Sequence, residues 1–229
     1  KAMPRGDIEP IQSGFATPPG NLVDARFDGV ELCAGPFSLL RQFLSPKTNT
    51  REDQYGGDVD DRAAVVSETL AAVQRAVDVP VGLHLSLAEL EYGGYEFEDA
   101  PAIVDAVDGY DYLSCTAGTR TTFDQTHAGA LVDSPPLLEG IETVAPQVDV
   151  PVMGRAPLTT PANAGAVLDA GADLVCFTRQ LLADPETVRR ALLGDGEPTH
   201  TRCIECNQKC LEGVYGHAHG GHVECVVAP

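Results

Sequence analysis

The chain of 229 residues is 43% hydrophobic, which is enough to fill the core of one large domain or two small ones. Its 34 acidic residues outnumber its 15 basic ones and give a net charge of −19, which argues against binding to nucleic acid or anionic lipid. It contains no apolar stretch of about 18 residues, and its polar start does not resemble a signal peptide. We therefore expect a cytoplasmic protein without a membrane or nucleic-acid partner.

The acidic excess has two explanations. Either the surface recognises a cationic partner, or it is adapted to high salt, where dense carboxylates stay hydrated and their mutual repulsion is screened. The acidic residues are spread along the whole chain rather than gathered in one segment. This distribution favours the second explanation and predicts a halophilic source organism.

The predicted elements alternate between short apolar runs and amphipathic helical runs. The chain opens with a predicted helix over Asp7–Ala25, although two glycines and two prolines inside it disfavour a regular helix. Five apolar runs, mostly rich in Val and Leu, are typical of strands buried on both faces: Gly29–Leu32, Val79–Leu85, Tyr110–Cys115, Val150–Gly154 and Leu174–Thr178. Apolar residues at helical spacing lie between them, over Arg62–Val77, Glu98–Val107, Leu137–Val144, Pro161–Ala170 and Pro185–Leu193.

This alternation predicts an α/β fold built from parallel βαβ units. Five units are too few for a closed eight-stranded barrel, which needs about 250 residues, but they suit a large part of one. We therefore predict a partial (β/α)8 barrel of the TIM type, with a doubly wound sheet as the structural alternative. The barrel part is assigned to residues 1–196 and a cysteine-rich segment to residues 197–229.

The strongest chemical signal is a group of cysteines near the end of the chain. Cys203, Cys206 and Cys210 lie within one tight loop, and Cys225 follows after fourteen intervening residues. This spacing is typical of a [4Fe–4S] cluster with three ligands from a loop and a fourth from a separate segment. Zinc sites usually show two separate pairs of ligands, and only one CxxC pair is present, so zinc is the less favoured alternative. The other three cysteines are isolated in apolar runs and are predicted to be buried hydrophobic residues.

A second signal lies at the ends of the last two predicted strands. Gly154 and Arg155 end one strand, and Thr178 and Arg179 end the next. The loops after the last strands of a β/α barrel commonly bind phosphate through backbone N–H groups, and arginine adds charge-assisted contacts. A single Gly-Arg at a strand end is more often a turn with a surface ion pair. Two successive strand ends of this kind favour a phosphate site.

Several motifs together resemble the Old Yellow Enzyme family of NADH:flavin oxidoreductases. The cysteine block with the amides that follow Cys206, and the Cys-Val-Val-Ala-Pro ending, are similar to its iron–sulfur branch, which includes 2,4-dienoyl-CoA reductase and trimethylamine dehydrogenase. The other motifs that carry the resemblance are Phe27–Leu32, Leu40–Pro46, Thr48–Asn49, Arg51, Asp53–Gly57, Arg62, Asp173–Val175, Arg179 and Leu182–Pro185.

The resemblance implies an FMN-binding barrel followed by a [4Fe–4S] loop, with FAD and NAD(P)H bound by further C-terminal domains. It implies that this chain corresponds to about strands 4–8 of the barrel together with the cluster segment. The remaining strands and domains would then belong to a longer polypeptide or to a complementing chain. An electron-transfer partner is implied by the cluster, and a small-molecule substrate by the flavin.

The substrate side departs from the family pattern. After Glu31-Leu32, relatives carry His-Gly-Ala-His or His-Gly-Ala-Asn, or a tyrosine further on, to orient a carbonyl or donate a proton. Here the run from Cys33 ends in Ser38, and serine is a far weaker acid than tyrosine. Arg120 lies near the position of a catalytic histidine of the reductase, and His127 is close enough in sequence to substitute for it. The alternative is that His127, in a polar loop, is simply solvated.

A further departure concerns the flavin. Relatives place an arginine where His84 stands, and its cation faces the flavin to stabilise the reduced anion. A histidine does this only while it is protonated, so the flavin potential would become sensitive to pH. The alternative is that His84 is a barrel-lining side chain bonded to a neighbour.

These observations lead to one favoured function and two alternatives. The favoured one is an FMN- and [4Fe–4S]-containing oxidoreductase that transfers hydride between NAD(P)H and an enoyl, enone or amine substrate and passes single electrons through the cluster. The second is a non-catalytic electron-relay or scaffold subunit that keeps the cluster but has lost substrate chemistry. The third is a zinc-stabilised β/α binding module.

Overall fold

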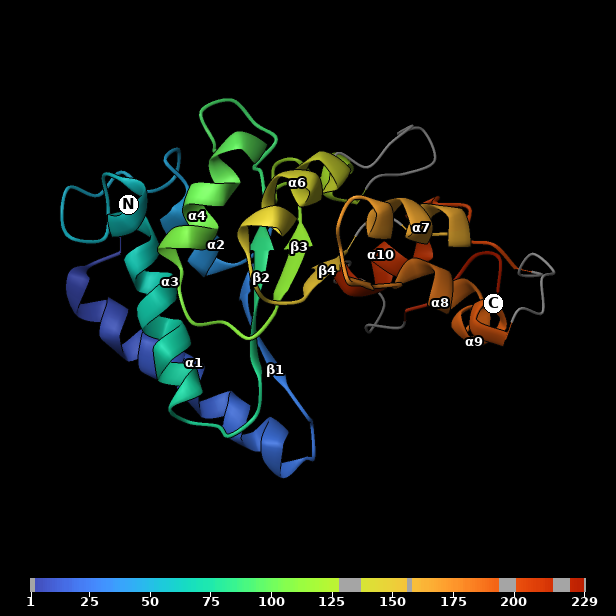
Figure 1. The fold of residues 1–229 in the computed structure, drawn as a ribbon, viewed down its shortest axis with the longest axis horizontal. Coiled ribbons are helices and arrows are strands. Elements are labelled where there is room, and N and C mark those ends of the chain that lie inside the picture. The colour runs from blue at the N-terminus through green and yellow to red at the C-terminus, as the bar shows by residue number, and fades with distance from the viewer. Residues whose placement is uncertain (1–2, 128–136, 156–157, 194–200, 216–222, 229) are drawn as a thin grey trace.

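The computed structural model describes residues 3–127, 137–155, 158–193, 201–215 and 223–228. Five parallel strands form one sheet in the order β1-β2-β3-β4-β5, so that neighbours in sequence are neighbours in space (Figure 1). Their bounds are Val30–Ala34 (β1), Val81–Ser86 (β2), Leu113–Thr116 (β3), Val152–Gly154 (β4) and Leu174–Val175 (β5). A doubly wound sheet reverses its strand order at a switch point. The sequential order excludes that alternative and confirms the predicted arc of a β/α barrel.

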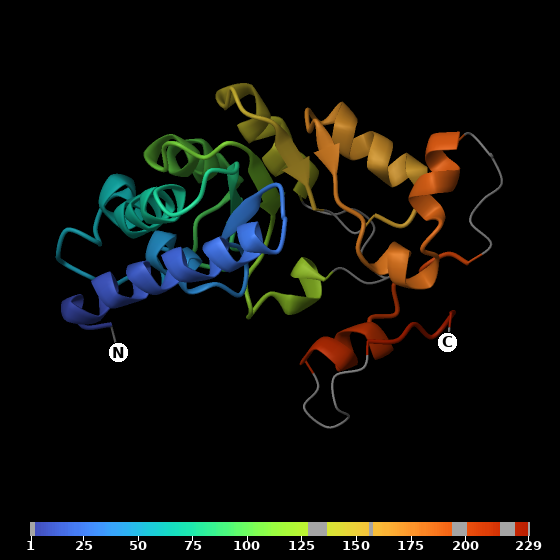
Figure 2. The ribbon, with the colours of Figure 1, turned by 90° about the horizontal axis from the view of Figure 1, so that it is seen from below.

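Helices connect and follow the strands, and α1 lies alongside α3 (Figures 1 and 2). Their bounds are Ile8–Asp24 (α1), Leu39–Leu44 (α2), Val59–Gln74 (α3), Ala100–Ala106 (α4), Phe123–Thr126 (α5), Leu137–Val144 (α6), Pro161–Asp169 (α7), Arg179–Ala183 (α8), Thr187–Leu193 (α9) and Lys209–Tyr215 (α10). Short 3-10 turns cover Arg5–Asp7, Phe97–Asp99 and Ala145–Gln147. All five predicted strands and every predicted helix are present, with shifted ends.

The sheet has two chemically different faces because side chains alternate along each strand. On one face Leu32, Leu83, Leu113 and Val152 are buried in the hydrophobic core that the helices complete. The opposite face, called the inner face below, carries the side chains that alternate with them: Glu31, Cys33, His84, Ser114, Thr116, Met153 and Arg155. The inner face is therefore mainly polar.

Several helices differ from the sequence-based expectation. Helix α1 is continuous from Ile8 to Asp24 with Pro18 and Pro19 inside it, although two prolines each remove a backbone hydrogen bond. Two residues of this helix, Ile8 and Pro19, are buried against the rest of the chain. Helices α2, α5, α8 and α10 are too short to show an apolar period and were not predicted. The expected boundary between residues 196 and 197 lies outside the described residues.

The three isolated cysteines differ in burial. Cys115 on β3 is buried, as predicted for a small hydrophobic residue in a strand. Cys33 is exposed and Cys176 is half-buried, so the prediction of full burial is wrong for both. The reason for Cys33 is its position on the inner face of β1, where the helices do not cover the sheet.

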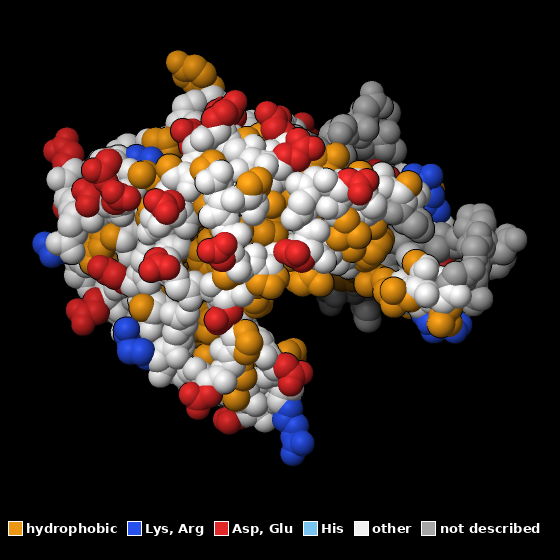
Figure 3. All heavy atoms as spheres, viewed as in Figure 1, with side chains coloured by type: hydrophobic (Ala, Val, Ile, Leu, Met, Phe, Trp, Pro, Cys, Tyr) orange, Lys and Arg blue, Asp and Glu red, His pale blue; other side chains and the backbone are white. Residues whose placement is uncertain are grey.

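The surface reflects the composition. Acidic side chains are spread over the face seen in Figure 3, and the few Lys and Arg side chains lie mostly toward its margins. Across the described part of the chain, no helix combines the length and the apolar character that crossing a membrane requires.

Candidate active site

A charged pair spans the inner face of the sheet. The Arg155 guanidinium, which follows β4, donates to the Glu31 carboxylate of β1 at 2.7 Å. Nδ1 of His84, on β2 between them, lies 3.9 Å from the same Glu31 oxygen. The Glu31 and Arg155 side chains are 19% and 33% exposed. Carboxylate, imidazole and guanidinium thus meet on the inner face, where Arg155 reaches from the carboxyl end of β4 back to Glu31, the second residue of β1.

His84 also links a chain of hydrogen bonds across three strands. The Cys33 sulfur lies 3.5 Å from Nδ1 of His84, and Nε2 of His84 lies 2.9 Å from the Thr116 hydroxyl. The Thr116 hydroxyl in turn donates to the carbonyl of Leu85 at 3.3 Å. The chain is consistent when Nε2 carries the imidazole proton and the thiol donates to Nδ1.

Burial, aided by the nearby Arg155 cation, lowers the pKa of His84 to about 4. The imidazole is therefore neutral at neutral pH. The ring packs directly over Gly35, because a Cβ at that position would lie 2.5 Å from Cε1 of His84. Partial loss of solvent raises the pKa of the Cys33 thiol. The pair is a neutral thiol and a neutral imidazole rather than a thiolate and an imidazolium.

Two buried polar atoms at this site lack a hydrogen-bond partner among the described residues. They are the hydroxyl oxygen of Ser114 and Nε of Arg155. Ser114 is fully buried, and its register partners His84 and Met153 place it on the inner face. Because buried polar groups in folded proteins are nearly always paired, these atoms indicate that an acceptor is brought to the inner face from outside this part of the chain.

The three substrate-side candidates differ in their surroundings. The Ser38 hydroxyl donates to the Gly35 carbonyl at 2.9 Å and accepts from the backbone N–H of Arg41 at 3.1 Å, which caps helix α2. Arg120 is exposed on the loop after β3. His127, at the end of α5, stacks on the Phe123 ring with centroids 4.4 Å apart, and burial lowers its pKa.

The phosphate-site candidates lie at the ends of β4 and β5, as their sequence positions require. Gly154 turns its Cα toward the helices, where a Cβ would meet Val167 at 2.3 Å, so the glycine is needed for packing of α7 on the sheet. Arg155 points to the inner face, and Thr178 is the exposed N-cap of α8. Arg179 donates to the side-chain oxygen of Asn207 in the cysteine loop.

All four predicted cluster cysteines line one small pocket. Cys203, Cys206, Cys210 and Cys225 line it together with Arg179, Asn207, Lys209 and Glu224, and the Lys209 ammonium pairs with the Glu224 carboxylate at 2.7 Å. The Cys203 sulfur accepts a hydrogen bond from the backbone N–H of Glu205 at 3.4 Å. Among the residues that the structure describes, no three His, Cys, Asp or Glu side chains converge tightly enough to hold a single metal ion.

The pocket is tied to the carboxyl end of the sheet. The Asn207 amide, besides accepting from Arg179, donates to the backbone carbonyl of His127. Asn207 has a positive φ of 54°, a left-handed conformation that asparagine adopts more readily than most residues. The cysteine loop therefore contacts both the segment after β3 and the segment after β5.

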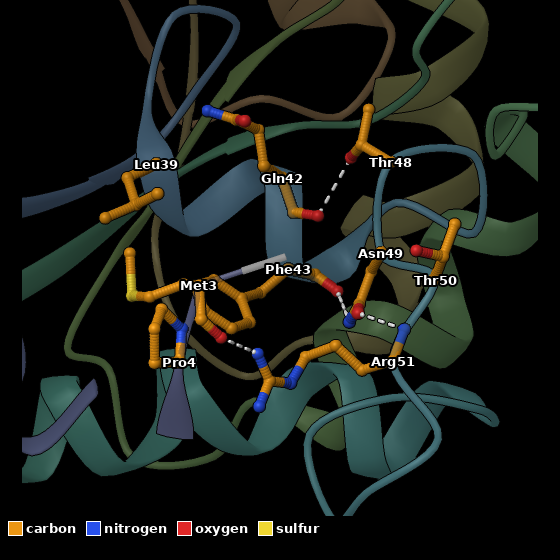
Figure 4. A pocket seen from close by; sticks show the side chains of 9 residues that line it. All are labelled: Met3, Pro4, Leu39, Gln42, Phe43, Thr48, Asn49, Thr50 and Arg51. Atoms are coloured by element: carbon orange, nitrogen blue, oxygen red, sulfur yellow. Dashed lines mark hydrogen bonds between the residues drawn. The ribbon is translucent and has the colours of Figure 1, made fainter. Parts of the chain in front are cut away.

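The motif from Leu40 to Arg62 builds a second hollow, between α2 and the loop that precedes α3 (Figure 4). Asn49 donates to the carbonyls of Phe43 and Tyr55 at 2.7 and 2.6 Å, and Arg51 donates to the carbonyl of Met3. Arg62 donates to the carbonyl of Leu44 at 2.8 Å. These polar side chains are used to hold the loop in place, so the motif has a structural role here.

Sequence reasoning missed several residues of the site. Glu31, Ser114 and Thr116 were not singled out, and neither was the buried Gln180 beside the cysteine loop. Glu31 and Thr116 carry a usable signal, since each is a polar residue at an alternate position of an apolar strand. Gln180 carries none, because its role depends on contacts that only the folded chain forms.

Comparison with known proteins adds a family match. Residues 1–194 match the model of the NADH:flavin oxidoreductase / NADH oxidase family. A metal reductase of Desulforamulus reducens is 34% identical over 218 residues, which cover 91% of this chain and 32% of the relative. The chain therefore spans about a third of the length of that relative.

Two solved structures share the fold. The 2-naphthoyl-CoA reductase complex superposes with a TM-score of 0.79 at 24% identity, covering 93% of this chain and 33% of the other. A histamine dehydrogenase from Rhizobium sp. 4-9 superposes with a TM-score of 0.79 at 24% identity, covering 90% of this chain and 30% of the other.

Proposed function

Because the chain belongs to the NADH:flavin oxidoreductase / NADH oxidase family, we propose that it is part of an oxidoreductase that binds FMN and a [4Fe–4S] cluster. When bound, the flavin supplies hydride transfer and the cluster supplies single-electron transfer. The observation that carries the proposal is the position of the four-cysteine pocket, which contacts the segments after β3 and β5 through Asn207. A cluster there would lie beside the end of the sheet that carries the polar inner face.

The inner face offers hydrogen-bond donors that suit a flavin. Arg155 and Ser114 present buried donors without partners among the described residues, and flavin oxygens or phosphate oxygens are suitable acceptors. His84 with Nε2 protonated leaves Nδ1 as an acceptor, which the Cys33 thiol occupies. Neutral His84 holds no charge against a reduced flavin, so Arg155 is the cation that this face offers. We propose Gly154, Arg155 and Thr178 as residues that hold the FMN phosphate, with His84 toward the ring, whereas Arg179 is engaged by Asn207 of the cysteine loop.

The cysteine pocket fits a four-iron cluster better than a single zinc ion. A zinc ion needs its four ligands around one point, whereas each iron of a [4Fe–4S] cluster takes one cysteine. The four cysteines line one pocket, and their spacing, three within eight residues and a fourth after fourteen more, is the one that a [4Fe–4S] cluster commonly uses. The N–H of Glu205 on the Cys203 sulfur and the nearby Arg179 cation suit the negative charge of a thiolate-bound cluster.

The substrate class follows from the relatives only in outline. Their names indicate reduction of metals or of a naphthoyl thioester, or oxidation of histamine. We propose a small enoyl, enone or amine substrate that approaches from the open side of the inner face near Arg120 and His127. Because Ser38 caps α2, its hydroxyl serves the fold as well as any substrate contact.

The same observations support a second candidate, an electron-relay subunit without substrate chemistry. Ser38 is engaged in the cap, Arg120 is exposed and apart from the charged pair, and His84 is neutral. In this candidate the cluster and its contacts are retained while the substrate side is not used.

One set of measurements on anaerobically purified protein separates these candidates. Visible absorption shows whether flavin bands, a broad iron–sulfur shoulder, or both are present, and elemental analysis gives iron and zinc per chain. We expect flavin, iron and labile sulfide together, and reduction of the flavin by NADH or NADPH in the intact protein. Cluster absorption without flavin favours the relay subunit, and a colourless protein containing zinc contradicts both.

A further inference from the structure

Gln180, in the first turn of α8, is a fully buried glutamine with 0% exposure. Glutamine is mostly an exposed residue, and burying its amide is costly unless hydrogen bonds replace those with water. Here the amide is satisfied on both sides. Nε2 donates to the Thr187 hydroxyl at 2.9 Å and to the Thr201 carbonyl at 3.1 Å, and Oε1 accepts from the backbone N–H of Cys203 at 2.9 Å.

Two of these three bonds reach the start of the cysteine segment. One planar amide pairs with the carbonyl of Thr201 and with the N–H of Cys203, as the peptide group of a neighbouring strand would. The backbone on both sides of Arg202 is thereby fixed against α8. The third bond, to Thr187, stays between α8 and the start of α9 and does not touch the cysteine segment.

The fixed backbone carries the first of the pocket cysteines. Cys203 is the most buried of the four, with 8% exposure, and its sulfur receives the N–H of Glu205. The direction in which this sulfur points is set by the backbone of residues 201–203. Gln180 holds that backbone without contacting the sulfur itself.

We propose that Gln180 is a positioning residue for the metal centre, which orients the Cys203 ligand through its backbone. This inference rests on the proposed function, because it requires Cys203 to be a cluster ligand. Residues that orient metal ligands from outside the coordination sphere commonly change metal retention by about 10–100-fold when they are replaced. A residue that only stabilised the fold would change unfolding without a specific effect on the cluster.

The test compares two variants of the full chain after anaerobic purification. Gln180→Met keeps an unbranched side chain of similar length but loses all three hydrogen bonds. The matched control Thr187→Val removes the bond from Gln180 to the Thr187 hydroxyl and the bond from that hydroxyl to the Asp184 carbonyl. It leaves the Gln180 amide paired with Thr201 and Cys203. The readouts are the rate at which an iron chelator bleaches the cluster absorption and the EPR spectrum of the reduced cluster.

We expect bleaching of Gln180→Met to be about 10–100-fold faster than wild type, with a changed EPR spectrum, and bleaching of Thr187→Val to stay within about twofold. Equal bleaching rates in the two variants, or an unchanged Gln180→Met, overturn the inference. If Gln180→Met does not fold, Gln180→Glu replaces it, because one carboxyl oxygen still accepts from the Cys203 N–H while the other, as a carboxylate, cannot donate to the Thr201 carbonyl. Faster bleaching in Gln180→Glu than in Thr187→Val is then expected, and equal bleaching in the two variants overturns the inference.

The wild-type protein separates the two levels of this proposal. A wild-type chain that takes up no iron contradicts the proposed function itself. If the wild-type chain holds the cluster and Gln180→Met changes neither its bleaching rate nor its EPR spectrum, only the role of Gln180 is contradicted.

Discussion

Arg155 contacts Glu31 at 2.7 Å although two strands separate β4 from β1. Adjacent strands lie about 4.8 Å apart, so three steps across a flat sheet amount to about 14 Å. Side chains stand roughly perpendicular to a sheet, and their tips would not meet across such a distance on a flat one. The ion pair therefore reports the curvature of the sheet toward its inner face, and this curvature gathers Glu31, His84 and Arg155 into one site.

Arg155, one member of this ion pair, also lowers the pKa of His84. Burial is the larger cause of its low pKa and the Arg155 cation is the second. We expect Arg155→Met to raise the pKa of His84 above about 4 while leaving it below 6.5. The measurement is the pH dependence of the imidazole NMR signals. Arg120→Met, which removes an exposed arginine from the loop after β3, is the control and should leave the titration unchanged; an unchanged pKa in Arg155→Met would contradict the assignment.

Protonation of His84 should also destabilise the fold at low pH. Its folded-state pKa of about 4 lies below the ordinary 6.5, so the unfolded chain binds the proton first as the pH falls. The contribution of neutral His84 is fully present above about pH 6.5 and is lost as the pH falls toward 4. The gap corresponds to about 3 kcal/mol.

Urea unfolding of wild type and His84→Gln at a series of pH values measures this contribution. Other carboxylates also titrate in this range, so the difference between the two proteins is the relevant quantity. We expect wild type to lose more stability than His84→Gln between pH 6.5 and 4. If the free energies of unfolding of the two proteins change with pH in parallel, His84 has the same pKa in the folded and unfolded chains, which would contradict the prediction.

Two glycines should respond to alanine in opposite directions. A Cβ at Gly154 would lie 2.3 Å from a Val167 methyl group, so Gly154→Ala should lower the free energy of unfolding by about 1–3 kcal/mol. Gly165 lies inside α7, and a Cβ there would meet nothing within 4 Å. Gly165→Ala should therefore raise the free energy of unfolding by about 0.5–1 kcal/mol. Thermal or urea unfolding of both variants tests the packing of α7 on β4. An unchanged free energy of unfolding in Gly154→Ala would show that α7 does not pack closely against β4 at this position.

Substitutions of Ser38 test whether its hydroxyl caps helix α2. Ser38→Ala should lower the free energy of unfolding by about 1 kcal/mol, because the backbone N–H of Arg41 loses its acceptor. Aspartate is as good an N-cap as serine, so Ser38→Asp should restore most of the loss. Unfolding in urea measures both variants. A loss in Ser38→Ala that Ser38→Asp does not restore at all would contradict the capping role.

The parallel β/α architecture was predictable because Val- and Leu-rich strands alternate with helical runs and need no distant partner to be recognised. The continuity of α1 was not, since the cost of Pro18 and Pro19 is local while the burial that offsets it is tertiary. Helices α2, α5, α8 and α10, of 6, 4, 5 and 7 residues, are shorter than two apolar periods.

In the candidate site, too, some features were predictable from the sequence and others depend on tertiary contacts. The cysteine spacing pointed to one pocket because three of the four residues lie in a single loop. The charge of His84 could not be read from the sequence, because it depends on burial and on Arg155, 71 positions away along the chain. The use of Ser38 as a cap depends on the fold of the loop that places its hydroxyl between Gly35 and Arg41.

The most direct test of the account is the iron content and EPR spectrum of the anaerobically purified chain with one cysteine replaced at a time. Wild type should hold about four irons and four sulfides per chain and give a one-electron signal when reduced. Cys206→Ser should lose that signal, and Cys176→Ser, which changes a cysteine outside the pocket, should keep it. A wild-type chain that carries zinc in place of iron, or a Cys206→Ser chain that retains the wild-type signal, would contradict the assignment of these cysteines to a [4Fe–4S] cluster.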